Sequence, residues 1–495
     1  MSAVDTWINA ANTVFQLHNL IFIFGISIIG LIIGFLPGIG PLTALPLFMP
    51  ITFGMKPATA LIVLAVLYMS CVYGGSISAI LLNTPGTASS AATCLDGYPM
   101  ARQGKGGVAI GISMMSSFIG GFIGLAGLIF LSPVIADFAL KFQPAEYFML
   151  AVLGLVLISA SASGSMIKAL IAAAFGVLTS SVGLDLMTGQ PRFAFGSLYL
   201  KGGIPFIPLI IGIFAFSEIL FLVRRGEGTI AEKGGLSGRI IDGLKEPWKH
   251  PKTLIRASLI GLGIGVIPGE GAAVANFTAY LIEVKSSKRP KDFGTGIPAG
   301  IIAPEASNNS CVAGTLIPTL TLGIPGGGVA AIFLGGVMLH GLNPGFELFT
   351  RHKDVLYTLF FGLVLANFVL FICGASLSRY IARVTIIPIT ILIPAVISLG
   401  ISASYLMRYN VIDVIVAITA GVLGYFMRKY GYSTIAFIVA ILLSPIAERS
   451  FFQALLIADG SYLTFALRPI SGTLLLLTIL VIVGPPLFRK MRKRK

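Results

Sequence analysis

Apolar residues along the chain fall into long runs that are separated by short polar stretches and by Pro-Gly clusters. The runs at 58–82, 106–131 and 355–375 are long enough for a helix to cross a bilayer, which takes about 20 residues. Other runs, such as 42–54 and 272–284, are too short to cross alone. The short runs come in pairs, and each pair meets at a Pro-Gly cluster. This pattern predicts helices that are interrupted within the membrane.

Four Pro-Gly clusters, numbered here as the first to the fourth break, interrupt the apolar runs. Pro ends a helix, and Gly lets the backbone approach a neighbour or a ligand closely. In order along the chain, the breaks are Pro37-Gly38-Ile39-Gly40-Pro41, Asn83-Thr84-Pro85-Gly86, Pro268-Gly269-Glu270-Gly271 and Ile324-Pro325-Gly326-Gly327-Gly328.

The two halves of the sequence resemble each other around these breaks. The segment from Gly34 to Gly40 matches the segment from Gly265 to Gly271, at an offset of 265 − 34 = 231. Ser70-Cys71-Val72 matches Ser310-Cys311-Val312 at 310 − 70 = 240, and Pro85-Gly86 then falls on Pro325-Gly326. Two motifs recur in the same order. Internal repeats with interrupted helices are typical of secondary transporters.

Composition supports a membrane protein. The 495 residues are 56% hydrophobic and 11% charged, and the mean hydropathy is +0.95. A soluble domain carries about 25% charged residues, so a disordered chain, a nucleic-acid binder and a cytosolic enzyme are excluded. The four Cys have no CxxC spacing, and the four His form no cluster. Neither residue type therefore indicates a disulfide or metal site.

Basic residues set the expected orientation. The net charge is 34 − 19 = +15, and the bases concentrate in loops and at the tail. The sequence predicts a first membrane repeat at 1–223, a basic cytoplasmic linker at 224–256, a second membrane repeat at 257–488 and a cytoplasmic tail at 489–495. Residues 1–55 contain no Lys or Arg, so the N-terminus is expected outside.

The same charges orient the breaks. The first break follows a segment without bases and is expected to enter from outside. The third break is flanked by the basic linker and by Lys285-Ser286-Ser287-Lys288-Arg289, so it is expected to enter from the cytoplasm. Opposite entry predicts an all-α polytopic membrane protein with two inverted-topology repeats and re-entrant helical hairpins.

A broken helix offers chemistry that an intact one does not. Unpaired N–H groups at a half-helix start favour an anion, and unpaired C=O groups at a half-helix end favour Na⁺ or a proton donor. Four breaks that converge would form a site for a small anion and a coupling cation; the alternative is a set of plain kinks. The predicted substrate-binding residues are Pro37, Gly38, Gly40, Thr43, Asn83, Thr84, Pro85, Gly86, Thr87, Ser89, Pro268, Gly269, Gly271, Pro325, Gly326 and Gly327. For Ser89 and Ser90 the alternative is a hydrogen bond to their own helix.

Acidic residues at membrane depth are candidates for ion coupling. Glu270 lies inside the third break, and its alternative role is to satisfy a helix N-terminus. Glu305, with Asn308 and Asn309, could coordinate a cation, and the alternative is a solvated loop. Asp96 precedes Arg102 and Lys105, which favours a structural loop or an ion pair. Four further acids near span ends are expected to anchor a helix or pair with Arg: Glu218, Asp413, Glu448 and Asp459.

The motifs together resemble a known family. Gly34-Phe35-Leu36-Pro37-Gly38-Ile39-Gly40-Pro41, Tyr73-Gly74-Gly75-Ser76, Leu82-Asn83-Thr84-Pro85-Gly86 and Asp96-Gly97-Tyr98-Pro99-Met100-Ala101 look like the large membrane subunit of tripartite tricarboxylate transporters, of TctA type. The resemblance covers essentially the whole chain.

The resemblance implies a bacterial inner-membrane carrier that works with a small four-helix membrane subunit (TctB type) and a periplasmic solute-binding protein (TctC type). It implies a carboxylate substrate, such as citrate, driven by a Na⁺ or H⁺ gradient, with substrate and ion at the four breaks. By fold analogy, a scaffold holds a mobile transport domain, as in an elevator.

Three other functions remain open at this point. They are an ion-coupled carrier of another small solute, an anion channel and an intramembrane protease. The protease would need a Ser–His or paired Asp arrangement, and Ser163-Gly164-Ser165 has no suitable His nearby. No Walker A motif occurs, so the sequence predicts neither ATP hydrolysis nor another enzyme activity.

Overall fold

The computed structural model describes residues 3–492 except 37, 163, 186, 226–237, 270 and 382–388. The predictions for Pro37 and Glu270, and for parts of the linker and tail, therefore lie outside the described residues. The helices of the first half are α1 (Ala3–Val14), α2 (Leu17–Phe35), α3 (Pro41–Phe48), α4 (Pro57–Leu82), α5 (Cys94–Met100), α6 (Gly106–Ala139), α7 (Pro144–Ser161), α8 (Met166–Ser180), α9 (Leu198–Lys201), α10 (Phe206–Ile210) and α11 (Ser217–Arg225).

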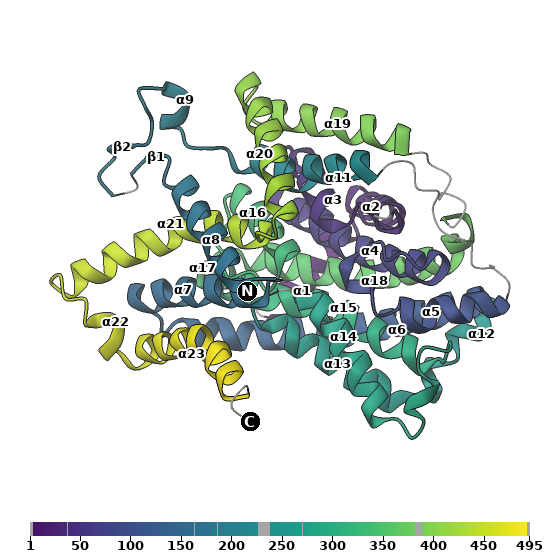
Figure 1. Cartoon of the computed structure of the whole chain (residues 1–495). Helices are drawn as coiled ribbons and strands as arrows, with labels where there is room; N and C mark the ends of the chain where they lie inside the picture. Colours follow the sequence, from purple (N-terminus) through teal and green to yellow (C-terminus); the bar gives the residue numbers. More distant parts are fainter. Residues whose placement is uncertain are drawn as a thin grey trace.

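The second half is also helical (Figure 1). Its helices are α12 (Ile240–Leu244), α13 (Pro251–Val266), α14 (Gly271–Ser286), α15 (Ala299–Leu322), α16 (Gly328–Leu339), α17 (Phe346–Thr350), α18 (Lys353–Ile381), α19 (Ile389–Leu406), α20 (Val411–Lys429), α21 (Thr434–Ile457), α22 (Thr464–Leu467) and α23 (Pro469–Arg492). A 3-10 turn, η2 (Ala88–Ser90), precedes α5, and a π-helical segment, η4 (Ile211–Phe216), joins α10 to α11.

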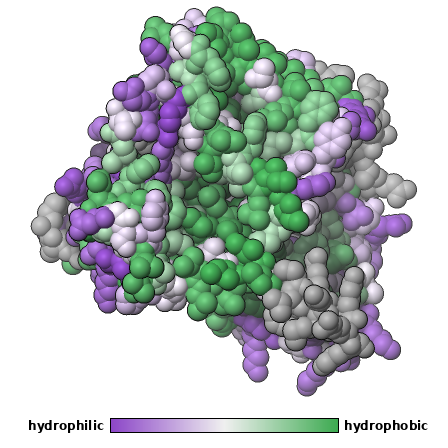
Figure 2. Space-filling view, turned by 60° about the vertical axis from the view of Figure 1, so that its left-hand side comes forward, coloured by the Kyte–Doolittle hydropathy of each residue, from purple (hydrophilic) through white to green (hydrophobic). Residues whose placement is uncertain are grey.

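Eight helical segments among the described residues are long and apolar enough to cross a membrane. Five shorter apolar helices accompany them, including α16 and the segment that begins with α3. The protein is therefore an all-α polytopic membrane protein, as predicted. Figure 2 shows a face on which hydrophobic side chains dominate, as lipid contact requires.

Helices α4 and α15 form the centre of the molecule. The membrane-spanning window of α4 is buried throughout, and α15 is buried from Gly300 to Thr321. Helix α2 packs along α4, α13 packs along α15, and α6 and α18 cover the remaining sides. Residues 304–309 lie inside α15, so the alternative of a solvated loop at Glu305 is wrong. Hydropathy falls there because the buried helix carries a polar face.

Glycines let the helices approach to backbone contact in both halves. A Cβ at Gly34 would lie 2.0 Å from the Cys71 carbonyl oxygen, and one at Gly265 would lie 2.7 Å from that of Cys311. A Cβ added at Gly86 would lie 1.9 Å from Gly34 O, and one at Gly326 would lie 2.6 Å from Gly265 O. These pairs are related by the sequence offsets of 231 and 240. The two pairs of breaks are thus packed alike.

The two halves also interlock. Helices α10 and α11, from the first half, pack with η4 against α20, whereas α21, from the second half, packs against α7 and α8. The halves defined by the repeat therefore do not pack as two separate bodies.

Ion pairs between the halves accompany this packing. Arg428 pairs with Glu218 at 2.5 Å, and Arg192 pairs with Glu448 at 2.6 Å. Asp413 pairs with Arg408, within the second half. Glu218, Asp413 and Glu448 thus pair with Arg as predicted, and no ion pair of Asp459 occurs in the described part of the chain.

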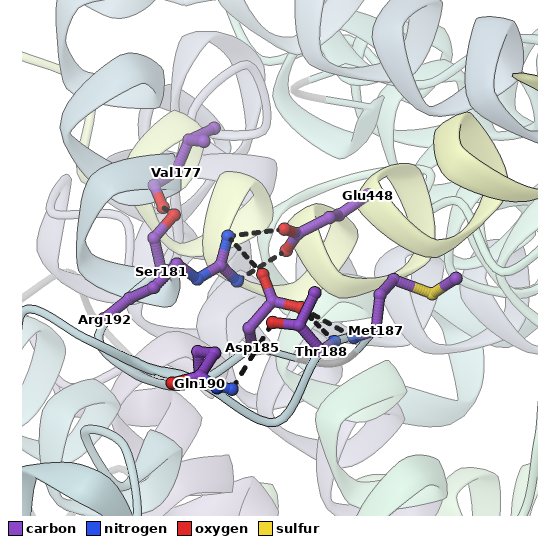
Figure 3. A network of polar contacts seen from close by, with 8 residues as sticks. All are labelled: Val177, Ser181, Asp185, Met187, Thr188, Gln190, Arg192 and Glu448. Atoms are coloured by element: carbon purple, nitrogen blue, oxygen red, sulfur yellow. Dashed lines mark hydrogen bonds and ion pairs between the residues drawn. The ribbon is translucent and has the colours of Figure 1, made fainter. Parts of the chain in front are cut away.

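The Arg192–Glu448 pair fixes a β-hairpin that projects from the bundle. Strands β1 (Gly183–Leu184) and β2 (Pro191–Arg192) are antiparallel, and Arg192 is also 3.4 Å from Asp185. Figure 3 shows Arg192 between these two carboxylates. Asp185 accepts hydrogen bonds from the backbone N–H groups of Met187 and Thr188, and these bonds lower the pKa of its carboxyl group.

Candidate functional site

The first and second breaks lie against each other. Helix α2 ends at Phe35 and α3 begins at Pro41, and α4 ends at Leu82. The Gly86 N–H group donates to the Gly75 carbonyl at 3.3 Å, which folds the second break back onto α4. A Cβ at Gly40 would lie 3.6 Å from Gly86 O, so the two breaks are in backbone contact.

The third and fourth breaks form a second pair. The Gly269 N–H group donates to Gly326 O at 3.2 Å. A Cβ at Gly327 would in turn lie 3.2 Å from Gly269 O. The Gly326 N–H group faces the Thr319 hydroxyl at 3.4 Å. The structure therefore brings the predicted residues together two breaks at a time.

The half-helices after the breaks begin without side-chain caps. Gly40 is the N-cap of α3 and Gly327 is the N-cap of α16, and no side chain among the described residues caps either helix. Polar N-caps normally satisfy the first N–H groups of a helix. In α3, Pro41 has no N–H group and the Thr43 N–H group donates to Gly40 O at 3.0 Å, so few donors are left for a ligand. The first N–H groups of α16 have no side-chain cap, and together with the helix dipole they favour a bound anion.

A cluster of hydroxyl groups follows the second break. The Thr87 hydroxyl lies 2.9 Å from that of Ser89 and 3.0 Å from that of Ser90, and all three residues are buried. The Ser90 hydroxyl also donates to Thr87 O at 3.0 Å. The alternative role, a hydrogen bond to the local backbone, is therefore confirmed for Ser90. At the offset of 240, the fourth break has Gly327, Val329 and Ala330 in the places of the three hydroxyl residues, which makes the two pairs of breaks chemically unequal.

The remaining predicted binding residues have different environments. Thr43 is buried in the first turn of α3. Asn83 is exposed and ends α4 in a left-handed conformation, and Thr84 donates to Leu82 O at 3.2 Å. Pro268 lines a cavity of about 120 Å³ between α7 and the second pair of breaks. Every side chain around this cavity is apolar, so it is unsuited to a carboxylate.

Glu305 lies in a cage of hydroxyl groups. Thr93 donates to its Oε1 at 2.5 Å, and Ser113 and Ser117 donate to its Oε2 at 3.0 and 2.8 Å. The donors come from the segment after the second break and from α6. Glu305 is fully buried, and no described basic side chain pairs with it. A buried carboxyl group without a basic partner needs a proton or a cation.

Two amides share the helix face of Glu305. Asn308 and Asn309 follow it by three and four residues, a spacing that places all three side chains on one side of α15. Both Asn side chains are buried, and neither amide has a hydrogen-bond partner in the described structure. Buried amides are rarely left unsatisfied in a native protein. Their unpaired donors and acceptors are therefore candidates for contacts with a ligand or an ion.

Residues from the second half fix the segment after the second break. Asn276, in α14, accepts from the Ala92 N–H group at 2.9 Å and donates to Pro304 O at 3.0 Å. Sequence reasoning missed this residue, although an Asn in the half-helix after the third break was a visible indication.

Asp96 makes a further connection between the halves. It accepts from the Tyr280 hydroxyl and from the Gly294, Gly296 and Ile297 N–H groups. The expected loop at Asp96 is instead the helix α5, and its described partners are hydrogen-bond donors rather than Arg102 or Lys105. A carboxylate with several backbone donors needs no basic partner.

Within the described residues, no group of three or more His, Cys, Asp or Glu side chains could hold a metal ion. The four cysteines are free. A cation at this site would therefore be held by Glu305 together with hydroxyl, amide or carbonyl oxygens.

Comparison with known proteins assigns a family. The model of the tripartite tricarboxylate transporter TctA family matches residues 20–439. An Agrobacterium vitis protein called "Uncharacterized 52.8 kDa protein in TAR-I ttuC' 3'region" is 34% identical over 480 residues, which cover 96% of this chain and 95% of that protein. A second one, "Uncharacterized protein in TAR-II ttuC' 3'region", is 30% identical over 220 residues, or 44% of this chain and 91% of that protein. No solved structure matches the chain.

Proposed function

Since this chain belongs to the tripartite tricarboxylate transporter TctA family, we propose that it imports small carboxylates of the citrate or dicarboxylate type, driven by a Na⁺ or H⁺ gradient. The family and the membrane-spanning helices point to a transporter subunit rather than an enzyme. The carrier acts in the bacterial inner membrane, with the N-terminus in the periplasm and the C-terminus in the cytoplasm.

The observation that supports this function best is the pairing of the breaks. Each pair joins two interrupted helices by direct backbone contact, and the half-helices α3 and α16 begin with uncapped glycines. Backbone of this kind is tolerated in a membrane only where it is buried in protein or lines a watery cavity. Substrate carboxylates bind at these N–H groups, with the Thr87 and Ser89 hydroxyls beside them.

Glu305 supplies the coupling site in this proposal. Its carboxyl group is buried among hydroxyl groups from two other segments, and the Asn308 and Asn309 amides lie on the same helix face. Binding of the coupling ion neutralises the carboxylate. Because Thr93 follows Thr87 by 93 − 87 = 6 residues, ion binding at Glu305 and substrate binding at Thr87 act on the same short segment.

The transporter is tripartite in this proposal, as its family implies. A small four-helix subunit of TctB type accompanies the chain in the membrane, and a periplasmic solute-binding protein of TctC type delivers the substrate. Helices from both inverted repeats together form a scaffold and a mobile transport domain in this proposal. The recurrence of the glycine contacts at offsets of 231 and 240 supports the repeat.

Uptake by the reconstituted assembly tests this function. Proteoliposomes with the full chain and its partner subunits are given labelled citrate or succinate, and Na⁺ and H⁺ gradients are imposed in turn. Saturable uptake that requires one gradient is expected. Ohmic current without saturation would instead identify an anion channel. Saturable uptake of other solutes alone would identify an ion-coupled carrier with a different substrate.

A further inference from the structure

A charged side chain lies directly against the backbone of the first break. Gly38 has φ +89°, and a Cβ added there would lie 3.0 Å from Oε1 of Glu218 and 3.5 Å from the Leu222 side chain. Glu218 is in the first turn of α11. The glycine thus brings the bare backbone of the break into contact with a carboxylate from another helix.

Arg428 neutralises this carboxylate from one side only. Its Nη1 donates to Glu218 Oε2 at 2.5 Å, and its guanidinium group lies over the Phe221 ring, 4.5 Å from the centroid. Within the described residues Arg428 makes this one hydrogen bond, whereas a guanidinium group has five N–H donors. Oε1 of Glu218 remains turned toward Gly38. The pair therefore keeps unused hydrogen-bonding capacity beside the break.

The corresponding glycine of the second half meets a different side chain. Gly269 corresponds to Gly38, because 269 − 38 = 231, and a Cβ there would lie 2.6 Å from the Ser161 hydroxyl. Among the described residues, a carboxylate thus lies beside Gly38 and a hydroxyl group lies beside Gly269.

The chemistry of the pair fits an exchange of partners. A carboxylate beside the start of α3 opposes a bound anion, unless an arginine can leave it and receive that anion instead. The side chain of Arg428 is 39% exposed and that of Glu218 is 12% exposed, so the guanidinium group is the more accessible partner. Replacing one carboxylate by another keeps the guanidinium charge paired, which avoids the cost of leaving it alone in a low dielectric.

We propose that Arg428 binds one carboxylate of the substrate at the first break, and that Glu218 holds the guanidinium group there until the substrate displaces it. The inference rests on the carboxylate transport proposed above and names a residue that determines its specificity. Arg is suited to this role because its planar donors match a carboxylate in a bidentate arrangement.

Two substitutions that each remove one charge separate exchange from simple anchoring. In the reconstituted assembly, with labelled citrate as the probe, Arg428→Gln is expected to raise KM about tenfold or more, because it removes a charge-assisted hydrogen bond. Glu218→Gln removes the competing carboxylate and is expected to lower KM severalfold. A purely structural ion pair would make both variants change KM in the same direction, and that outcome overturns the inference.

The second ion pair between the halves provides the control. Arg192 pairs with Glu448 at 2.6 Å, and the second carboxylate near it is that of Asp185 in the hairpin. Arg192→Gln is expected to leave KM for citrate within about twofold of that of the unaltered protein. A change in KM as large as that of Arg428→Gln would overturn the inference, because the loss of any ion pair between the halves would then explain both changes.

A milder variant and the unaltered protein complete the test. If Arg428→Gln does not fold, Arg428→Lys keeps the charge but loses the bidentate geometry, and it is expected to raise KM severalfold. An unchanged KM in a folded Arg428 variant overturns this inference while the proposed function stands. Absence of citrate and succinate uptake by the unaltered assembly overturns the proposed function, and the inference with it.

Discussion

Asn83 and Gly323 end the two central helices in the same way. Asn83 closes α4 with φ 52° and ψ 24°, and Gly323 closes α15 with φ 69° and ψ 20°. Both are left-handed, and they lie 323 − 83 = 240 residues apart, the offset that relates the neighbouring motifs. Only Gly, and to a lesser degree Asn, adopts this conformation at low cost. The first half thus combines the required backbone with a polar side chain.

This pairing separates a backbone role of Asn83 from a binding role. Asn83→Ala is expected to lower stability by about 1–2 kcal/mol, because Ala disfavours the left-handed conformation. Asn83→Gly keeps that conformation and removes only the amide. If Asn83 contacts the substrate as proposed, Asn83→Gly weakens citrate binding at an unchanged Tm. Normal citrate affinity in this variant would remove Asn83 from the site.

Glu305→Gln tests the coupling site. The variant keeps the size of the side chain and an acceptor for the hydroxyl groups, and it removes a buried charge. We expect it to fold with at least the original Tm and to lose the dependence of uptake on the driving ion. Uptake is measured over a series in which Na⁺ is replaced and the pH is varied. Glu283→Gln is the matched control, because Glu283 is also buried but already has a basic partner, Arg256. This control variant should keep the ion dependence of uptake. In Glu305→Gln, ion dependence equal to that of the unaltered assembly would contradict the role of Glu305.

Gly34→Ala tests the contact between α2 and α4. Its Cβ would lie 2.0 Å from a backbone carbonyl oxygen that cannot move freely, so we expect a loss of several kcal/mol, as for other overpacked core positions. Gly25, in the same helix, has nothing within 4 Å of the equivalent point. Gly25→Ala should therefore stabilise the helix by about 0.5–1 kcal/mol. Tm in detergent is the measurement, and equal effects of both changes would contradict the close packing.

The hairpin between β1 and β2 should respond to acid. The pKa of Asp185 is lowered by the backbone N–H groups of Thr188 and Met187, and Arg192 adds to the shift. Its contribution to stability is therefore complete above the ordinary Asp pKa of about 3.9 and is lost as the pH falls through the lower folded value. The protection of the Met187 and Thr188 amides against hydrogen exchange, relative to the intrinsic rate at each pH, should fall in that range. Asp185→Asn keeps an acceptor but does not titrate, so its protection should not change with pH, and a loss of protection on acidification in that variant would exclude the carboxylate as the cause.

The breaks and the ionisable candidates were readable from the sequence because each rests on local chemistry. Pro-Gly clusters cannot continue a helix, so the structure ends α2, α4, α13 and α15 where the sequence predicts. Glu305 was identifiable because a carboxyl group in an apolar region is unusual. Its surroundings were not, since a buried polar helix face and a polar loop have the same hydropathy. The continuity of α15 through residues 304–309 therefore appears only in the fold.

Long-range partners were beyond sequence reasoning for a different reason. Glu218 and Arg428 lie 428 − 218 = 210 residues apart, and each looks like an ordinary charge near the end of a span. The same holds for Asn276, whose two hydrogen bonds reach Ala92 and Pro304. Such contacts depend on how the two halves pack together, which no local pattern determines.

The interlocking of α10 and α11 with α20, and of α21 with α7 and α8, has a consequence for biosynthesis. The ribosome delivers α7, α8, α10 and α11 to the membrane long before it reaches α20 and α21. These early helices therefore remain in the lipid without their packing partners α20 and α21 until the C-terminal part is inserted. A nascent chain that stops before Val411 therefore leaves the first half unfinished, and quality-control proteases would be expected to remove it.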